Sequence, residues 1–600
     1  MATAPESSDD VRNARPLRFA QTFRLPAPFT LQCGQTLDNV EVVYETYGTL
    51  APTGDNAVLI CHALSGDSHV GKHDEGDDAG WWDICVGPGK PIDTNKFFVI
   101  CSNVLGGCRG TTGPMSANPR TGHPYGGDFP TVTIADMVDI QKLLIDHLGI
   151  GRLLAVIGAS MGGQQVLDWA TRHPTRVAGA VAVATSARLT HQALAFDVVG
   201  RNAILRDPHY NSGQYYSLPE GPRVGLAVAR MLAHITYLSP QAMDQKFSRP
   251  TPKRDLATEF ETRFAVGSYL AYQGHRFVER FDPNSYIYIT MAMDLFNLAA
   301  NPVALRRVLG QSLCRWLVLS FSSDWLFPPS QSREIVDALL ATNHPVTYCE
   351  VESPCGHDAF LLEHDFDRYG EMIRGFLDSL LAPSSTAADD PAMHQPQPTS
   401  IFHGHRFDYD MIEQLIPAGS SVLDLGCGSG RLLARLKSRE HQRLVGIEIN
   451  ELAIRECCRK GLDVVRVDLN LGLAAIPDNS FDCVVLSRTL QSVRHVEKVI
   501  QEMLRVGRNA LVSFPNLAYG PLRDRLAREG RAPCGPEGGP FEWYNTPDIR
   551  FMSIRDFEVF CEAHRFRVQN RVFLHSDTGQ RVTDDPNLNA DTAIFVLGRA

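Results

Sequence analysis

The segment AVIGASMGGQQVLDWA, residues 155–170, places Ser160 between Gly158 and Gly162. A serine in the pattern G-x-S-x-G is typical of a nucleophile held on a sharp turn between a strand and a helix. The glycines leave room for the backbone and for a substrate carbonyl group. Because an apolar run precedes Ser160 and a helix-like pattern follows it, the sequence favours a nucleophile over a surface serine in a loop. Ser160 would then accept an acyl group and pass it to water or to another acceptor.

A serine hydroxyl attacks only with the help of a base and of an acid that orients the base. The segment RWLVLSFSSDWLFPP predicts a strand over 316–321 that delivers Asp324 to the following loop. The segment VTYCEVESPCGHDAFL predicts another strand, followed by His357. The order Ser, Asp, His is the one that accompanies G-x-S-x-G. For the oxyanion hole we expect the backbone N–H groups of Met161, after the nucleophile, and of Leu64, in the strand-end segment CHALSG.

The elements that must position these residues alternate between strands and helices. NVEVVYETYG, NAVLICHALSG and FFVICSNVLGG predict strands that end in small residues. TIADMVDIQKLLIDHLG has the apolar spacing of a helix and ends at Gly149, after which RLLAVIG predicts the strand before the nucleophile. This alternation predicts an α/β fold with a mainly parallel sheet covered by helices.

A change of composition divides the chain. Residues 382–400 hold four prolines and almost no large apolar residue, which is typical of a linker. We expect a disordered tail over 1–16, an acyl-transfer domain over 17–381 with a helical lid at about 189–305, and a second domain over 401–600.

The composition excludes several classes of function. At 44% hydrophobic and 21% charged residues the chain is typical of a globular protein, and no apolar run is long enough to span a bilayer. A net charge of −11 argues against a surface for nucleic acid. The fourteen cysteines contain no C-x-x-C pattern and are typical of reduced thiols. We therefore expect small-molecule substrates, a cytoplasmic location, no metal site, and no nucleic-acid or membrane partner.

Six segments in the order CHALSGDSHV, NVLGGCRGTTGP, GASMGGQQVLDWA, ARMLAHITYLS, SSDWLFPP and SPCGHDAFL resemble the homoserine O-acyltransferases of methionine biosynthesis. This family has the α/β-hydrolase fold, and the resemblance covers about residues 17–380. It implies that Ser160, Asp324 and His357 form a catalytic triad. Acyl-CoA would acylate the serine, and the γ-hydroxyl of L-homoserine would then attack the acyl-enzyme. The resemblance implies no cofactor for acyl transfer beyond the CoA ester as co-substrate.

The same resemblance implies a clamp for the amino-acid substrate. Arg230 and Asp358 match the family's substrate-binding arginine and aspartate. A guanidinium suits a carboxylate, and a carboxylate suits an ammonium group. This clamp separates the acyltransferase from the rival hypothesis, a plain serine hydrolase. Without the resemblance Arg230 would be interpreted as a charge on a helix surface. The family also implies a homodimer formed through the lid helices.

The acyl donor depends on a position beside the triad acid. Family members that transfer succinyl groups tend to carry an arginine two residues after the aspartate, where this chain has Leu326. An apolar side chain offers nothing to a buried carboxylate, which is costly without a cationic partner. We therefore expect acetyl-CoA as the donor. Succinyl-CoA is the alternative, and Arg201 on the lid is a candidate cation for it.

The second part of the chain shows a glycine-rich turn after a predicted strand over 421–425. Such a turn lets a nucleotide-like ligand approach the backbone closely. The turn has the spacing GxGxG rather than GxGxxG, which favours S-adenosylmethionine over a dinucleotide, and a Rossmann-like domain without ligand is the alternative. The predicted ligand residues are Asp424, Gly426, Gly428 and Gly430, then Glu448 for the ribose, 18 residues after Gly430, and Asp468 after a third strand.

Two later segments, LSRTLQSVRHVEKVIQEMLRVGRNALVSFPN and FEWYNTPDIRFMSIRDFEVFC, resemble the MetW family of class I methyltransferase-like proteins over about 401–600. No residue is recognisable as a methyl-transfer base. Two hypotheses stay open. The domain is either a methyltransferase of unknown acceptor, or a module that senses S-adenosylmethionine or otherwise supports the attached acyltransferase.

Overall fold

The computed structural model describes residues 17–247, 264–381, 407–530, 546, 548–576 and 578–599. The chain divides into two compact units, Met1–Leu381 and Ala382–Ala600. The predicted tail, 1–16, and the predicted linker, 382–400, lie outside the described residues. Among the helices that the structure describes, none has the length and apolar character needed to cross a bilayer.

The N-terminal unit is built on a mainly parallel sheet. Its strands lie in the order β1 (Gln21–Arg24), β4 (Glu41–Tyr47), β8 (Phe98–Ser102), β5 (Ala57–Cys61), β9 (Leu153–Ala159), β10 (Val177–Val183), β11 (Arg315–Phe321) and β12 (Val346–Val351). The pairs from β8 to β12 are parallel, and β1 and β4 form an antiparallel edge. Two short pairs, β2 (Phe29–Thr30) with β3 (Thr36–Leu37) and β6 (Val86–Gly87) with β7 (Ile92–Asp93), lie outside this sheet.

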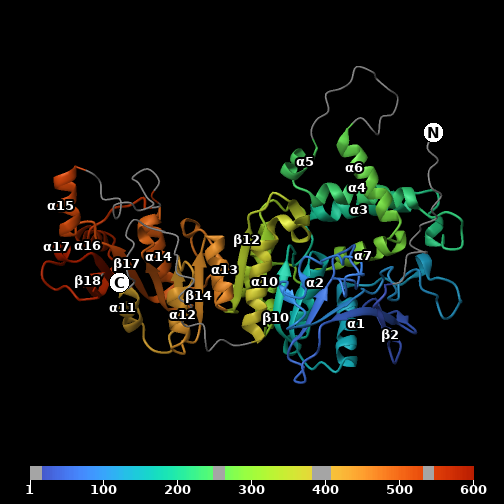
Figure 1. Cartoon of the computed structure of the whole chain (residues 1–600), viewed down its shortest axis with the longest axis horizontal. Coiled ribbons are helices and arrows are strands. Elements are labelled where there is room, and N and C mark those ends of the chain that lie inside the picture. Colours follow the sequence, from blue (N-terminus) through green and yellow to red (C-terminus); the bar gives the residue numbers. More distant parts are fainter. Residues whose placement is uncertain are drawn as a thin grey trace, which may run out of the picture. The chain divides into compact units, whose positions relative to one another are not determined.

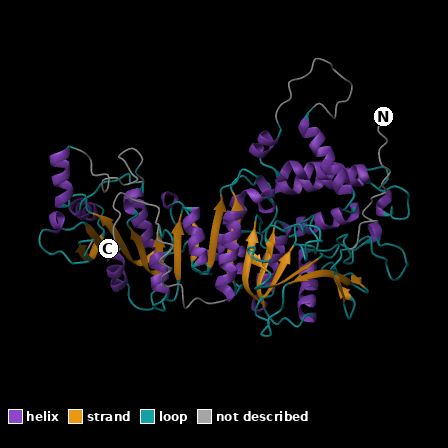
Figure 2. Cartoon of the chain, viewed as in Figure 1, coloured by secondary structure: helices purple, strands orange, loops and turns teal. Residues whose placement is uncertain are grey.

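The central strands are apolar along their whole length, as expected where helices cover both faces of a parallel sheet. Every residue of β5 and β9 is buried. The covering helices are α1 (Ile134–His147), α2 (Met161–Arg172), α9 (Pro329–Ala341) and α10 (Phe366–Leu381). Helix α1 begins with a capping box formed by Thr133 and Asp136 and is followed by Gly149 at a φ of 73°, the left-handed backbone that a C-terminal cap requires. Figure 2 distinguishes the helices, in purple, from the strands, in orange.

A helical segment is inserted between β10 and β11. Its described elements are α3 (His191–Leu205), α4 (Arg223–Tyr237), α5 (Pro240–Lys246), α6 (Ala265–Val278), α7 (Pro283–Leu295) and α8 (Pro302–Leu309). Helix α4 packs against both α3 and α6, and α3 also contacts α7 (Figure 1). Residues 248–263 of the predicted lid lie outside the described part.

The C-terminal unit contains a second sheet with the strand order β15 (Asp463–Arg466), β14 (Leu444–Glu448), β13 (Val422–Leu425), β16 (Phe481–Ser487), β17 (Gly507–Pro515), β19 (Thr592–Gly598) and β18 (Arg567–Leu574). The first five strands are parallel, and β19 lies antiparallel between β17 and β18. The helices are α11 (Phe407–Leu415), α12 (Arg431–Lys437), α13 (Glu451–Arg459), α14 (Val496–Val506), α15 (Gly520–Glu529), α16 (Ile554–Ala563) and α17 (Pro586–Asn589). The chain order reverses between β13 and β16, where open α/β sheets bind ligands at the carboxyl ends of their strands.

Candidate active site

Ser160 lies at the turn from β9 into α2, in a backbone conformation that few side chains adopt. Its φ is 56° and its ψ is −122°. The turn is close-packed, because a Cβ atom at Gly162 would lie 2.1 Å from the carbonyl oxygen of Cys61, and one at Gly158 would lie 2.3 Å from the backbone of Gly162. The N–H of Ser160 donates to the carbonyl of Val183 at 3.0 Å. These contacts hold the serine in a strained position of the kind found at nucleophiles.

The acid and the base follow β11 and β12, the last two strands of the N-terminal unit. Asp324 follows β11, and His357 lies in the 3-10 helix Gly356–Leu361 after β12. The His357 Nδ1–H donates to Asp324 Oδ2 at 2.7 Å. The other carboxylate oxygen of Asp324 accepts the backbone N–H groups of Leu326 at 3.0 Å and Phe327 at 2.9 Å. Since Asp324 binds Nδ1, the Nε2 atom of His357 is available as a base.

The pair also changes the basicity of the histidine. Burial alone would lower the pKa of His357, but the charge of Asp324 and the hydrogen bond to it outweigh burial and raise this pKa above its ordinary value. The Asp324 carboxylate therefore stabilises the imidazolium that forms when His357 accepts a proton. Among the described residues the structure records no hydrogen bond between His357 and Ser160, a contact that often tightens only when substrate is bound.

Ser160 lines a cavity under the inserted helices. The walls are mostly apolar and come from the sheet side and from α3, α4 and α7: Leu64, Leu189, Ala193, Phe196, Asp197, Ala229, Leu232, Ala233, Thr236, Tyr237, Tyr286, Met293, Leu326 and Phe327. The ring of Phe327 stacks on that of His357, with centroids 5.0 Å apart. Ser160 and Phe327 therefore line one cavity, and Phe327 contacts His357 of the Asp324–His357 pair. The catalytic role of each residue stays a prediction.

The predicted oxyanion residues lie where their backbone can face this cavity. Met161 is the first residue of α2, and the N–H groups in the first turn of a helix have no acceptor within the helix. Leu64 follows β5 and lines the cavity. Backbone donors at these two positions fit the stabilisation of a tetrahedral intermediate on Ser160.

Arg230 is not a surface charge, as its position on a helix alone would suggest. Its side chain on α4 is buried, with the guanidinium carbon 4.5 Å from the ring centroid of Phe277 and 5.4 Å from that of Tyr237. Its Nε and Nη1 atoms have no hydrogen-bond partner among the described residues. Burial raises the pKa of Asp358, and the charges of His357 and Arg230 oppose that rise, so Arg230 and Asp358 lie within electrostatic reach of each other. Arg230 itself does not line the cavity, but its neighbours Ala229 and Ala233 do.

Leu326 lines the Ser160 cavity, and Arg201 does not. Arg201 is bound instead to Asp294 of α7. The lining contains one acidic residue that the sequence pattern did not single out, Asp197 of α3, whose pKa is raised by burial and by the carboxylate of Asp294. Asp197 stands in the apolar stretch ALAFDVVG, residues 193–200, and the sequence pattern does not show that this residue faces the cavity.

The glycine-rich turn of the C-terminal unit joins β13 to α12. Gly426, Gly428 and Gly430 all have positive φ angles, of 70°, 54° and 72°. A Cβ atom at Gly430 would lie 2.5 Å from Leu462 and 2.9 Å from the sulfur of Cys457, so the turn is close to the element behind it. Asp424 is buried at the end of β13. The turn stands at the reversal point of the strand order, where a nucleotide-like ligand would bind.

The carboxylate of Glu448 accepts hydrogen bonds from backbone N–H groups, which the sequence pattern does not indicate. One carboxylate oxygen accepts the N–H of Gly428 at 2.7 Å, and the other accepts those of Ile449 at 2.7 Å and Asn450 at 2.9 Å. Glu448 therefore holds the glycine-rich turn as well as standing at the predicted ribose position. Asp468 accepts the N–H of Asn470 at 2.9 Å and its side-chain amide at 2.8 Å.

Comparison with known proteins agrees with this two-part architecture. The family described as alpha/beta hydrolase fold matches residues 56–364, and the family described as methionine biosynthesis protein MetW matches residues 406–597. The solved structure of esterase E22 superposes with a TM-score of 0.55 at 33% identity, covering 60% of this chain and 99% of the esterase.

Two curated relatives extend the match. A homoserine O-acetyltransferase of Methanohalobium evestigatum is 54% identical over 57% of this chain and 70% of its own length. The bifunctional methionine biosynthesis protein MetXA/MetW of Rhodopirellula baltica is 49% identical over 99% of this chain and 95% of its own length. Because this last similarity runs through both units, the chain belongs to the MetXA/MetW family, in which an α/β-hydrolase-fold unit is followed by a MetW unit.

Proposed function

We propose that the N-terminal unit is a homoserine O-acetyltransferase of methionine biosynthesis, which moves the acetyl group of acetyl-CoA to the γ-hydroxyl of L-homoserine. The names of the two curated relatives support this function. The observation that carries it is the buried Arg230, whose guanidinium has two nitrogen atoms without a partner among the described residues and lies near Asp358. A hydrolase that uses water needs no such pair, whereas an amino acid offers a carboxylate to one member and an ammonium group to the other.

The geometry suits a reaction in two halves. In the first, His357 Nε2 takes the proton of Ser160 Oγ while that oxygen attacks the thioester carbonyl, and the N–H groups of Leu64 and Met161 stabilise the oxyanion. CoA leaves with the proton from His357. In the second half His357 accepts the proton of the homoserine hydroxyl, whose oxygen attacks the acetyl-serine, and the proton passes back to Ser160 Oγ. Asp324 holds His357 in the required tautomer throughout.

The walls of the cavity support an acetyl rather than a succinyl donor. No lysine or arginine belongs to the described lining, and Leu326 occupies the position beside the triad acid. Arg201, the candidate cation on the lid, is engaged by Asp294. The distal carboxylate of a succinyl group would therefore enter an apolar cavity without a cationic partner, which is unfavourable.

We expect the wild-type chain to prefer acetyl-CoA over succinyl-CoA, and Leu326→Arg to shift the ratio of kcat/KM values toward succinyl-CoA by roughly tenfold or more, the value of one charge-assisted hydrogen bond. The assay follows CoA release with both donors and separates O-acylhomoserine from free acid. Leu313→Arg, which adds the same charge at an exposed position, is the control. A wild-type preference for succinyl-CoA would contradict the donor, and free acetate as the main product in the presence of homoserine would favour an esterase.

For the C-terminal unit we propose binding of S-adenosylmethionine at the glycine-rich turn. The support is the position of Gly426, Gly428 and Gly430 at the reversal of the strand order, with Glu448 at the end of the neighbouring strand. A methyl-transfer role and a sensing role both begin with this binding. The attachment to the acyltransferase raises the effective concentration of one unit near the other, which favours the supporting role.

Glu448→Ala is expected to weaken the binding of S-adenosylmethionine to the full chain by roughly tenfold to a hundredfold. The variant removes charge-assisted hydrogen bonds to the ribose and also releases the N–H of Gly428. Isothermal titration calorimetry measures the effect. Asp478→Ala, which removes a carboxylate bound to Arg505 before β16, is the control. Absence of binding by the wild-type chain would support the ligand-free domain instead.

We also propose a cytoplasmic homodimer that associates through the inserted helices. The support is a set of large apolar side chains exposed on α3 and α4: Val198, Val199, Leu205, Val224, Val228 and Ile235. A monomeric mass in sedimentation of the full chain would contradict the dimer.

A further inference from the structure

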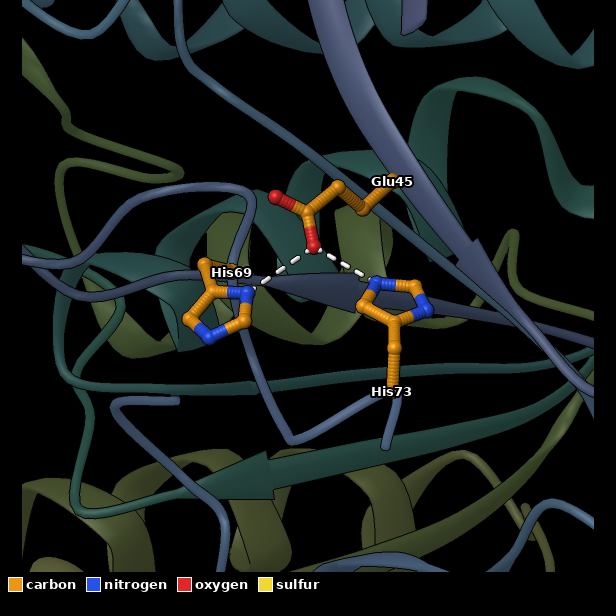
Figure 3. Close-up of side chains that lie close together, drawn as sticks. All are labelled: Glu45, His69 and His73. Atoms are coloured by element: carbon orange, nitrogen blue, oxygen red, sulfur yellow. Dashed lines mark hydrogen bonds and ion pairs between the residues drawn. The ribbon is translucent and has the colours of Figure 1, made fainter. Parts of the chain in front are cut away.

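A second cluster of chemically active side chains lies apart from the Ser160 cavity. Glu45 belongs to β4, and His69 and His73 belong to the loop between β5 and β6. His69 Nδ1 lies 3.0 Å from Glu45 Oε2, and His73 Nε2 lies 2.8 Å from the same oxygen. Figure 3 shows both rings turned toward this one carboxylate oxygen. One ligand atom from each residue lies within 4.8 Å of the others.

The carboxylate at the centre of the cluster is fully buried. The side chain of Glu45 has no exposed surface, while those of His69 and His73 are 12% and 15% exposed. Glu45 Oε2 is the oxygen that both histidines approach. Its second oxygen, Oε1, is buried without a hydrogen-bond partner among the described residues. A buried carboxyl group with a vacant acceptor atom is stabilised by a nearby cation or by further donors, which offset its desolvation.

The surroundings fix each ligand in the orientation that a metal ion requires. His69 Nε2 lies 2.9 Å from the carbonyl oxygen of Asp78. When Nε2–H donates to this carbonyl and the ring is neutral, the lone pair of Nδ1 is free to bind a metal ion. The ring of His73 lies between those of Phe19 and Tyr47, at centroid distances of 4.2 and 4.1 Å. The hydroxyl of Tyr47 accepts the N–H of Val70 at 3.1 Å and donates to Glu45 Oε2 at 2.8 Å. Contacts of this kind, to a carbonyl or a carboxylate, orient the ligands in known metal sites.

We propose that Glu45, His69 and His73 bind one divalent transition-metal ion of the chemistry of Zn²⁺. Two imidazoles and a carboxylate suit such an ion, whereas Ca²⁺ and Mg²⁺ prefer oxygen ligands alone. Ligand atoms about 2.1 Å from a tetrahedral Zn²⁺ are roughly 3.4 Å from one another. The present distances of 3.0 and 2.8 Å to Glu45 Oε2 are a few tenths of an ångström shorter, so small side-chain rotations suffice. A water molecule would complete the tetrahedron.

The bound ion would restrict the motion of the loop that carries Leu64, a predicted oxyanion donor. Leu64 lies at the start of the loop, between β5 and the two histidines, and lines the Ser160 cavity. Glu45 anchors the other side of the site in β4, which is separated from β5 by β8. None of the three proposed ligands lines that cavity in the described part of the chain. The ion would therefore act by positioning the loop and would not contact the acyl group.

The competing explanation is an ion pair without metal. In that state the hydrogen bond to Glu45 raises the pKa of His69 to about 9, so His69 holds a proton and Glu45 stabilises it. If this explanation holds, the protein contains no stoichiometric metal ion, and a chelator does not change its melting temperature. Metal content, rather than activity, therefore separates the two explanations.

The test uses the full chain, stripped with a chelator and titrated with Zn²⁺ in a calorimeter. We expect one high-affinity ion per chain, a rise of the melting temperature by about 3 °C or more at saturating Zn²⁺, and the visible absorption of tetrahedral cobalt when Co²⁺ replaces Zn²⁺. His69→Ala and His73→Ala should each weaken binding by about 100-fold or more, because loss of even an outer-shell partner costs 10- to 100-fold. His123→Ala, at an exposed loop histidine of the same unit, should leave it unchanged.

Binding of Mg²⁺ with equal affinity, or Zn²⁺ binding that survives in the His69→Ala/His73→Ala double variant, would overturn the site. So would a wild-type chain that takes up no Zn²⁺ and shows no thermal shift, a result that needs no variant to fold. If the two alanine variants are unstable, Glu45→Gln provides the same comparison, since it keeps the volume of the side chain and removes the anionic ligand.

Discussion

Ser160→Ala is expected to reduce kcat for acyl transfer by about 10⁴-fold or more, because the variant lacks the hydroxyl oxygen that we propose as carrier of the acetyl group. No acetyl adduct should appear on the intact protein by mass spectrometry after mixing with acetyl-CoA. The fold should persist, since the hydrogen bond of Ser160 that the turn uses is made by the backbone N–H to Val183. Circular dichroism and the melting temperature check this.

The matched control is Ser102→Ala. Ser102 ends β8, is fully buried, and its hydroxyl has no partner among the described residues, so it tests the loss of a buried hydroxyl in the same sheet. This variant should retain the acetyl adduct and normal turnover. An acetyl adduct on Ser160→Ala, or its normal turnover, would show that the nucleophile lies elsewhere in the chain.

The sequence could predict the residues that follow strand ends. The apolar run of β9, the two glycines and the helix of α2 are neighbours in the chain, so local pattern alone places Ser160 on the turn. Asp324 and His357 follow two later buried strands, β11 and β12, and parallel strands present their carboxyl ends at one edge of the sheet. The bond between Asp324 and His357 is the consequence of that topology.

Contacts between distant segments could not be predicted in this way. Glu45 lies 24 residues before His69, on a strand whose alternation indicates only which side chains face the core. Its contact with the two histidines depends on the path of the loop after β5 and on the antiparallel pairing of β4 with β8. The sequence pattern therefore does not indicate that these three side chains lie together. The place of Asp197 in the cavity lining could not be predicted either, because it depends on how α3 lies over the sheet.

In the C-terminal unit the sequence predicted the strand ends and the glycine-rich turn, but not the contacts of Glu448. The strand ends and the glycine-rich turn follow from local pattern, and the order of the seven strands agrees with the predicted class I methyltransferase domain. The backbone partners of Glu448 do not follow from pattern. A carboxylate at the end of a strand can accept N–H groups from a neighbouring turn as readily as it accepts ribose hydroxyls, and only the tertiary packing decides which it does.

The choice between homoserine and water as acceptor depends on Arg230. The aromatic rings of Phe277 and Tyr237 enclose its guanidinium, so water solvates it poorly, and its Nε and Nη1 atoms have no partner among the described residues. A substrate carboxylate that reaches this guanidinium would supply the missing acceptor. We do not expect Arg230 to take part in the half-reaction with acetyl-CoA, because it is not among the described residues that line the cavity at Ser160.

Arg230→Ala should therefore reduce kcat/KM for homoserine by about 100-fold or more, the value of a buried charge pair, and leave the rate of CoA release from acetyl-CoA without acceptor within a few fold. Arg230→Lys should recover only part of the loss, since an ammonium group cannot reproduce the two parallel bonds. Homoserine methyl ester makes the test specific: the wild type should discriminate strongly against the ester, and Arg230→Ala should not. Arg223→Ala, two turns earlier on α4, controls for the loss of a cation from the same helix. An equal loss in both half-reactions, or unchanged discrimination against the ester, would mean that Arg230 supports the fold of the inserted helices and does not bind the carboxylate.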